Sequence, residues 1–150
     1  MSGRKDPIRM VDVSGKPVVH REAEATGRIR LKKETVDAIR EGTVEKGAPL
    51  AVAEVAAALA VKRTPEAIPL CHPVPITSVD TRFELGEEHV EAWCRVTADY
   101  RTGVEMEALS GVTAALLNIW DMVKYMEKDE GGQYPETAIT DVRVVEKRKG

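Results

Sequence analysis

An acidic and a basic side chain stand three residues apart near the end of a long predicted helix, which runs from about Val104 to Met126. At this spacing, Asp121 and Lys124 lie on neighbouring parts of a helix surface. On an exposed surface such a pair contributes little to stability. In a cleft, the carboxylate can orient the lysine for acid–base catalysis. The pair is therefore either an ordinary surface ion pair or a candidate for proton transfer.

Two further groups could contact an anion or exchange a proton. Lys46 and Gly47 shortly precede a predicted helix, and a lysine beside a helix N-terminus can hold phosphate. His72 lies between Pro69 and Pro73, which restrict the backbone and so hold the imidazole in a nearly fixed orientation. The alternatives are a solvated loop lysine and a loop histidine that only forms a structural hydrogen bond.

Charged residues at the helix ends also have two interpretations. Glu107 is in the first turn of the long predicted helix, where a carboxylate ordinarily complements the helix dipole. It could instead accept hydrogen bonds from the paired N–H groups of a guanine-like or pterin-like ring. Lys62 and Arg63 close the preceding helix, where positive charge is favourable without any ligand.

The composition argues against several classes of protein. The 150 residues carry a net charge of -3, whereas a general nucleic-acid binder normally has a basic excess. Cys71 and Cys94 are too few for a disulfide framework, and no cysteine or histidine has zinc-ligand spacing. The N-terminus has no apolar signal region, and no apolar run reaches the length of about 18 residues that a membrane span needs. We therefore expect a cytoplasmic protein with no metal site, no nucleic-acid partner and no membrane contact.

Apolar periodicity indicates the elements that position these residues. Residues 1–10 indicate a flexible tail, and residues 11–150 have the length of a single catalytic domain. The predicted elements are a short strand over 28–31, helices over 34–40 and 49–62, strands over 79–85 and 90–99, the long helix, and a strand over 139–145. The prolines between residues 65 and 75 predict a rigid, extended segment. This order predicts an α+β fold with helices on one face of an antiparallel sheet.

Together the motifs resemble those of one family, the cyclic pyranopterin monophosphate synthases, also called molybdenum cofactor biosynthesis protein C. The resemblance covers nearly the whole chain from Met10 onward, in both the order and the spacing of the motifs. Its most specific parts are IPLCHP at residues 68–73 and TGVEMEAL at residues 102–109. The other matching positions are Met10–Ser14, Arg21 with Ala23, Ala25 and Gly27, Lys46-Gly47, Lys62-Arg63-Thr64 and Asp121–Lys124.

The resemblance implies a ferredoxin-like subunit in a homohexamer built as a trimer of dimers. It implies that the substrate is (8S)-3',8-cyclo-7,8-dihydroguanosine 5'-triphosphate, a product of a preceding radical enzyme. This compound becomes cyclic pyranopterin monophosphate, and diphosphate is released. No cofactor is implied for catalysis, although magnesium could accompany the triphosphate.

The resemblance also assigns roles to matching residues. Asp121 matches the active-site acid, and Lys46 and Lys124 match the catalytic lysines. The positions that match substrate-binding residues, or that supply further cations for the triphosphate, are Leu70, Cys71, His72, Met106, Glu107, Arg21, Lys62 and Arg63.

The chain departs from the family pattern in two places. Ala48 and Pro49 follow Gly47, where the family usually has an aspartate, so any role of that carboxylate is absent. The glycine-rich, lysine-bearing tail of the family is shortened, and Lys147 and Lys149 are the candidates to replace its lysine.

The spacing of the candidates predicts a site shared between subunits. Glu107 and Asp121 lie 14 residues apart, which separates them by roughly 21 Å along a continuous helix. One nucleotide-sized substrate is too small to contact both on the same helix. We therefore expect each site to combine the Glu107 end of one subunit with the Asp121–Lys124 end of its neighbour, across a two-fold pair of antiparallel helices.

Two other classes of function stay open at this point. A cyclase or phosphohydrolase acting on ordinary GTP would normally hold metal with clustered carboxylates, and the sequence has no evident cluster. A non-catalytic nucleotide- or pterin-binding module on the same fold needs no Asp–Lys pair in a cleft.

Overall fold

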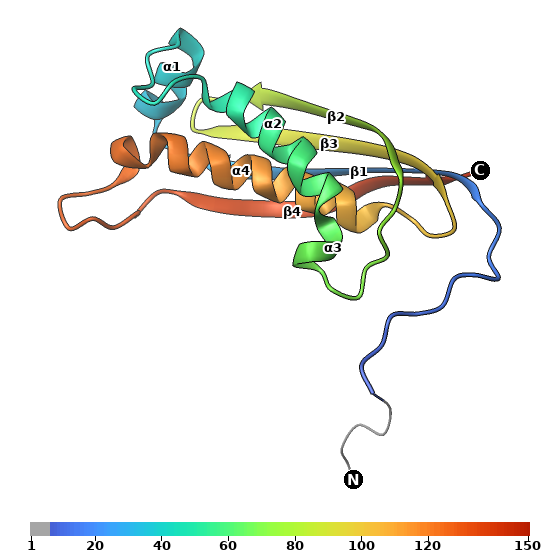
Figure 1. The fold of residues 1–150 in the computed structure, drawn as a ribbon. Helices are drawn as coiled ribbons and strands as arrows, with labels where there is room; N and C mark the ends of the chain where they lie inside the picture. The colour runs from blue at the N-terminus through green and yellow to red at the C-terminus, as the bar shows by residue number, and fades with distance from the viewer. Residues whose placement is uncertain (1–6) are drawn as a thin grey trace.

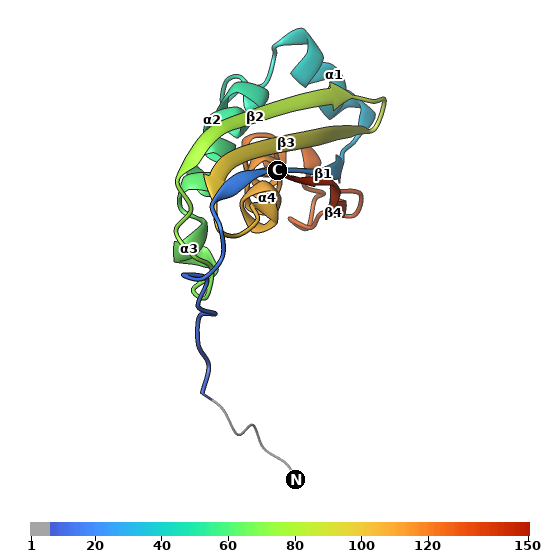
Figure 2. The ribbon, with the colours of Figure 1, turned by 90° about the vertical axis from the view of Figure 1, so that its right-hand side faces the viewer.

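The chain forms a four-stranded antiparallel sheet with helices along one face. The computed structural model describes residues 7–150. The elements are β1 (Val19–Arg30), α1 (Lys33–Glu41), α2 (Pro49–Lys62), α3 (Thr64–Ala67), β2 (Ile76–Leu85), β3 (His89–Tyr100), α4 (Glu105–Glu127) and β4 (Ala138–Lys149). The strand order is β2-β3-β1-β4, and each neighbouring pair is antiparallel. α2 and α4 pack on the same side of this sheet (Figure 1, Figure 2).

This arrangement confirms the predicted α+β class. With α1 and α3 set aside, the elements follow the β-α-β-β-α-β order that is typical of ferredoxin-like units. The long helix lies along the sheet, with α3 near its N-terminal end and α1 near its C-terminal end (Figure 1). Both ends of α4 are thereby close to segments that carry predicted site residues.

The first strand is longer than predicted, and the expected boundary at residue 28 was wrong. Alternate residues of β1 point toward the helices and are buried, namely Arg21, Ala23, Ala25, Gly27 and Ile29. Alanine and glycine are poor strand formers, so this alternation is a weak signal in the sequence. The strand forms because β3 and β4 pair with it on both sides. β4 is likewise longer than the predicted residues 139–145.

The helices before β2 agree with the prediction except in the proline-rich segment. α1 ends before Gly42, and α2 begins at Pro49 and ends at Lys62. The segment after α2 was expected to be extended, but Thr64–Ala67 forms the single turn α3. Pro65 is tolerated there because the N–H groups of a first helical turn have no partner within the helix.

Close packing fixes α4 against the sheet and against α2. A Cβ added at Gly111 would lie 2.5 Å from Sγ of Cys94 on β3 and 2.9 Å from Cγ2 of Val61 on α2. A Cβ added at Gly27 on β1 would lie 2.8 Å from Cδ1 of Leu116 on α4. Both glycines therefore allow an approach that no other residue permits without a shift. The positions of both ends of α4 follow from this packing.

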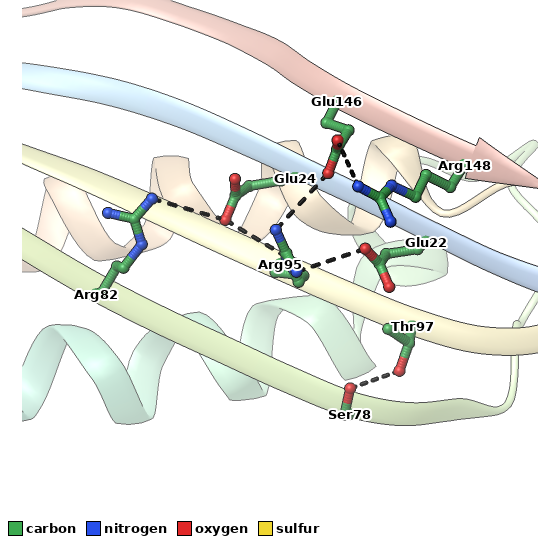
Figure 3. Close-up of polar contacts among 8 residues, drawn as sticks. All are labelled: Glu22, Glu24, Ser78, Arg82, Arg95, Thr97, Glu146 and Arg148. Carbon is green, nitrogen blue, oxygen red and sulfur yellow. Dashed lines mark hydrogen bonds and ion pairs between the residues drawn. The ribbon is translucent and has the colours of Figure 1, made fainter.

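The opposite face of the sheet is polar (Figure 3). Arg95 on β3 lies within 3.7 Å of the carboxylates of Glu22, Glu24 and Glu146, which come from β1 and β4. Arg82 on β2 lies 4.0 Å from Glu24. Partly exposed pairs of this kind add little stability individually. None of the predicted site residues lies on this face.

Two expectations concern the chain termini and the membrane. The flexible tail predicted over residues 1–10 falls mostly outside the described residues. Among the helices of residues 7–150, none combines the length and the apolar composition that a bilayer crossing requires.

Candidate active site

Three predicted catalytic residues lie together at the C-terminal end of α4. Lys124 Nζ lies 3.0 Å from Asp121 Oδ1. Lys46, in the loop between α1 and α2, donates a hydrogen bond of 3.1 Å to the main-chain oxygen of Asp121 and lies 3.7 Å from its Oδ2. All three side chains are partly exposed and are accessible to a ligand. Below, we call these three residues the lysine cluster.

Asp121 and Lys124 stabilise each other's charged forms. The pKa of Asp121 is lowered, first by its hydrogen bond and charge interaction with Lys124 and then by Lys46. The pKa of Lys124 is raised, mainly by Asp121. At neutral pH Lys124 is therefore an ammonium group that can donate a proton, and Asp121 is the carboxylate that holds it.

A pocket of about 430 Å³ lies at the opposite end of α4. Both predicted substrate-binding segments line it: Leu70, Cys71 and His72 from the segment after α3, and Met106 and Glu107 from the first turn of α4. These segments are more than 30 residues apart in the sequence. We call this feature the carboxyl pocket.

Burial distinguishes the carboxyl pocket from the lysine cluster. Glu107 is only 2% exposed, and this desolvation raises the pKa of its carboxyl group. Burial also raises the pKa of the Cys71 thiol, and the charge of Glu107 adds to that effect. A buried carboxyl group of this kind can accept hydrogen bonds from ring N–H groups that displace water.

Three charged residues that line the carboxyl pocket were not predicted as binding residues. Arg9 and Lys16 line the carboxyl pocket from the segment before β1 and add positive charge to it. Glu105 also lines the pocket, and its Oε2 lies 3.7 Å from Lys147 Nζ on β4. Apart from this ion pair, Glu105 Oε2 is buried with no hydrogen-bond partner among the described residues.

Lys147 was one of the two candidates to replace the tail lysine of the family, and the two-residue period of the strand could have indicated which side of the sheet it faces. Lys147 pairs with Ala23, and residues on that side of the sheet face α4. The predicted strand ended at residue 145, so this alternation was not extended to the lysine. Arg9 and Lys16 lie outside any regular element, and no periodicity indicates their position.

Three residues predicted to supply positive charge lie in neither the lysine cluster nor the carboxyl pocket of the same subunit. Arg21 is buried and donates hydrogen bonds to the main-chain oxygens of Tyr100 and Arg101, which lie just before α4. Arg63 lines a separate groove, and Lys62 is exposed at the end of α2. A role for any of them in binding stays a prediction.

The separate groove is apolar and lies between α2, α3 and α4. Its volume is about 570 Å³, and its lining includes Ala60, Ile68, Leu109, Ala114 and Leu117. Leu117 is 54% exposed, which is unusual for a leucine in the middle of a packed helix. The groove is lined by none of Lys46, Glu107, Asp121 and Lys124, so it is not the candidate for catalysis.

Metal ligands do not converge in the described part of the chain. Within residues 7–150, no three side chains of the types His, Cys, Asp and Glu form a group that could hold a metal ion. That catalysis needs no metal and no cofactor stays a prediction.

Fold and site together define a small α+β protein with an exposed Asp–Lys ion pair and a pocket lined by a buried carboxyl group at opposite ends of one helix. A family model described as "MoaC family" matches residues 10–150, and the chain belongs to this family. The family assignment made from the motifs is thus confirmed.

Curated relatives agree with the family assignment over nearly their full length. The proteins from Pyrococcus abyssi and Thermococcus kodakarensis are each named "Probable cyclic pyranopterin monophosphate synthase". They are 64% and 61% identical to this chain over 95% of it, and the matches cover 89% and 92% of those proteins. A relative from Methanothermobacter thermautotrophicus is 57% identical, with 95% of this chain and 89% of that protein covered. Its name calls it a synthase "accessory protein".

Proposed function

We propose that this protein is a cyclic pyranopterin monophosphate synthase of molybdenum cofactor biosynthesis. Its substrate is the cyclised dihydro-GTP named above, and its products are cyclic pyranopterin monophosphate and diphosphate. The names of the relatives support this activity. The observation that carries the proposal is that α4 presents an Asp–Lys pair at one end and a buried carboxyl group in a cation-bearing pocket at the other.

The lysine cluster suits the proton transfers of this reaction. Opening the five-membered ring of the purine and closing the pyranopterin require protons to be added and removed at several positions. Lys124 is protonated in the free protein, so its first step is to donate. Asp121 keeps the ammonium group oriented at 3.0 Å. Because both side chains are partly exposed, solvent can return the proton that Lys124 donates.

The carboxyl pocket suits recognition of the ring and of phosphate. Glu107 accepts hydrogen bonds from the N–H pair of the ring edge, and His72, Arg9 and Lys16 supply donors and positive charge for phosphate oxygens. During cyclisation a ribose hydroxyl attacks the inner phosphorus. The bond from that phosphorus to the diphosphate breaks, and the hydroxyl proton passes to a base. This step needs charge stabilisation more than a covalent intermediate.

A complete site requires two subunits under this proposal. Glu107 and Asp121 are separated by 14 residues of an unbroken helix, or roughly 21 Å. Ala114 is the midpoint between them and lines the apolar groove. If two copies of α4 cross antiparallel near Ala114, the Glu107 end of each copy lies opposite the Asp121 end of the other. The exposed Leu117 would be covered in such a pair.

The composition of α2 supports further association, as the proposed homohexamer requires. α2 is apolar around most of its circumference, and helices of this type are normally buried. Its outer surface nevertheless exposes Val52, Val55 and Leu59. A trimer of dimers would cover this surface with a neighbouring subunit.

The activity assay uses purified protein and the authentic cyclised dihydro-GTP. We expect formation of cyclic pyranopterin monophosphate with one equivalent of diphosphate. Lys124→Ala should lower kcat by roughly 10²-fold or more, the contribution typical of a positioned general acid. The thermal midpoint should stay close to that of the wild type because Lys124 is partly exposed. Lys128→Ala, a neighbouring exposed lysine outside the cluster, is the matched control.

The same assay separates the competing functions. A GTP-acting cyclase would release diphosphate from ordinary GTP without the preceding enzyme. A non-catalytic module, the class suggested by the "accessory protein" name of one relative, would bind the substrate without turnover, and Lys124→Ala would leave its affinity unchanged. Absence of product from the wild-type protein would refute the proposed activity. Turnover that persists in EDTA, in an assay that contains only the purified protein and its substrate, is expected if neither metal nor cofactor takes part.

A cytoplasmic location and the absence of nucleic-acid and membrane partners complete the proposal. They rest on the net charge of -3 and on the soluble nucleotide-derived substrate.

A further inference from the structure

Tyr125 contacts the loop that carries Lys46. Its hydroxyl oxygen accepts a hydrogen bond of 2.7 Å from the backbone N–H of Glu45, the residue just before the lysine. Tyr125 follows Asp121 by four residues, so the two side chains lie on one side of α4. One stretch of α4 therefore holds the loop backbone through Tyr125 and the lysine amine through Asp121.

Besides the Tyr125 hydrogen bond, a turn and a core residue restrict the backbone of the loop that carries Lys46. The loop lies between Gly42 and Gly47, which both have a positive φ, 74° at Gly42 and 121° at Gly47. Val44 is buried in the core, and its main-chain oxygen accepts a hydrogen bond of 3.1 Å from Gly47 N–H. The Glu45 N–H points to Tyr125. The backbone on both sides of Lys46 is thus defined by a turn, a core residue and one side-chain hydroxyl.

A second anchor holds the other end of the same segment to α4. Glu127 is fully buried, and its carboxylate accepts hydrogen bonds from Lys32 N–H at 3.0 Å and from the Thr35 hydroxyl, both at the start of α1. The Thr137 hydroxyl donates a third bond of 2.7 Å to it. Glu127 and Tyr125 therefore hold both ends of the α1–Lys46 segment to the last turns of α4.

We propose that Tyr125 is a positioning residue for catalysis, which places the Lys46 amine beside Asp121 by fixing the loop backbone one residue earlier. The inference rests on the proposed function, because it takes Lys46 to act in the reaction. Tyr125 does not itself contact the reacting atoms in this proposal. Its hydroxyl acts only through the Glu45 amide.

The test is Tyr125→Phe, which removes one oxygen atom from a side chain that is 43% exposed and should leave the fold intact. We expect kcat to fall about five- to tenfold, the factor that one lost hydrogen bond of ordinary strength corresponds to. KM and the thermal midpoint should change little. Thr77→Val is the matched control, because it also removes a hydroxyl that bonds a main-chain group, but on β2 at the polar face of the sheet.

A double-mutant cycle distinguishes positioning from a general structural effect. In single turnover with Lys46→Ala protein, adding Tyr125→Phe should have no further effect, since the group being positioned is gone. Equal losses in both backgrounds would overturn the inference, as would wild-type kcat in Tyr125→Phe.

Amide exchange at Glu45 tests the anchor independently of turnover. Tyr125→Phe should speed exchange of this amide, and an unchanged rate would overturn the inference. Full activity of Lys46→Ala would instead contradict the role of Lys46 in the proposed function, whatever the exchange rate at Glu45.

Discussion

At the scale of single residues, the two ends of α4 offer opposite electrostatic environments. Asp121 and Lys124 face solvent, and each stabilises the charged form of the other. Glu107 is buried, and this desolvation raises the pKa of its carboxyl group. The proposed reaction requires a charged proton donor, which Lys124 supplies. It also requires a hydrogen-bond acceptor shielded from water for the ring edge, which Glu107 supplies.

Glu107 should make stability depend on pH. A carboxyl group whose pKa is raised on folding contributes stability that is present below its unfolded pKa and is lost as the pH rises through the folded pKa. Glu107→Gln cannot ionise, so this variant does not lose stability at the pH values where the Glu107 carboxyl group ionises. Its thermal midpoint should therefore exceed that of the wild type at pH 8, and the gain should shrink toward pH 4, while turnover falls.

Thermal denaturation between pH 4 and pH 8 measures this effect, with the exposed Glu130→Gln as the control variant. A gain that is equal at both ends of the pH range would mean that ionisation of Glu107 is not its cause.

At the scale of elements, α4 determines the separation between the lysine cluster and the carboxyl pocket, and its packing keeps that separation constant. The helix approaches β3 and α2 closely at Gly111, where an added Cβ would meet Cys94 and Val61. α2, which follows the Lys46 loop, also packs along α4.

Gly111→Ala tests this packing. Alanine favours a helix over glycine by about 1 kcal/mol, but overpacking a dense core costs about 1–3 kcal/mol. We expect net destabilisation, measured by urea denaturation, because the added Cβ lies 2.5 Å from Cys94 Sγ. Adding Cys94→Ala should recover part of the loss by making room. Wild-type stability of Gly111→Ala, or strictly additive costs in the double variant, would contradict the close contact.

How far the sequence predicts this structure depends on the kind of signal. Pro49 and Gly42 mark helix boundaries by local backbone chemistry, and α1 and α2 formed where predicted. The length of β1 was underestimated because its alanines and glycine favour a strand only weakly, and the strand forms through pairing with β3 and β4 on both sides. Motif matching indicated the lysine cluster and five residues of the carboxyl pocket, but not Arg9 or Lys16, which lie outside any regular element. It did not indicate Tyr125 either, because the role proposed for Tyr125 depends on where a loop from elsewhere in the chain comes to lie.

At the scale of the whole molecule, one subunit carries both halves of the proposed site but does not bring them together. The helix between them is unbroken, and its midpoint borders an apolar groove with an exposed leucine. The opposite face of the sheet is polar, with ion pairs that join β3 to β1 and to β4 (Figure 3). The helical side, with its apolar groove, is therefore the surface available for pairing. Assembly is therefore part of the proposed catalytic mechanism.

Complementation between two inactive variants tests this account most directly. Glu107→Ala and Lys124→Ala proteins are mixed under conditions in which mass spectrometry shows subunit exchange, and turnover of the cyclised dihydro-GTP is measured. In a two-fold dimer each hybrid regains one intact site, so random exchange should restore about a quarter of wild-type activity. If subunits exchange and activity stays at the level of the separate variants, each site lies within one chain, and the shared-site account is wrong.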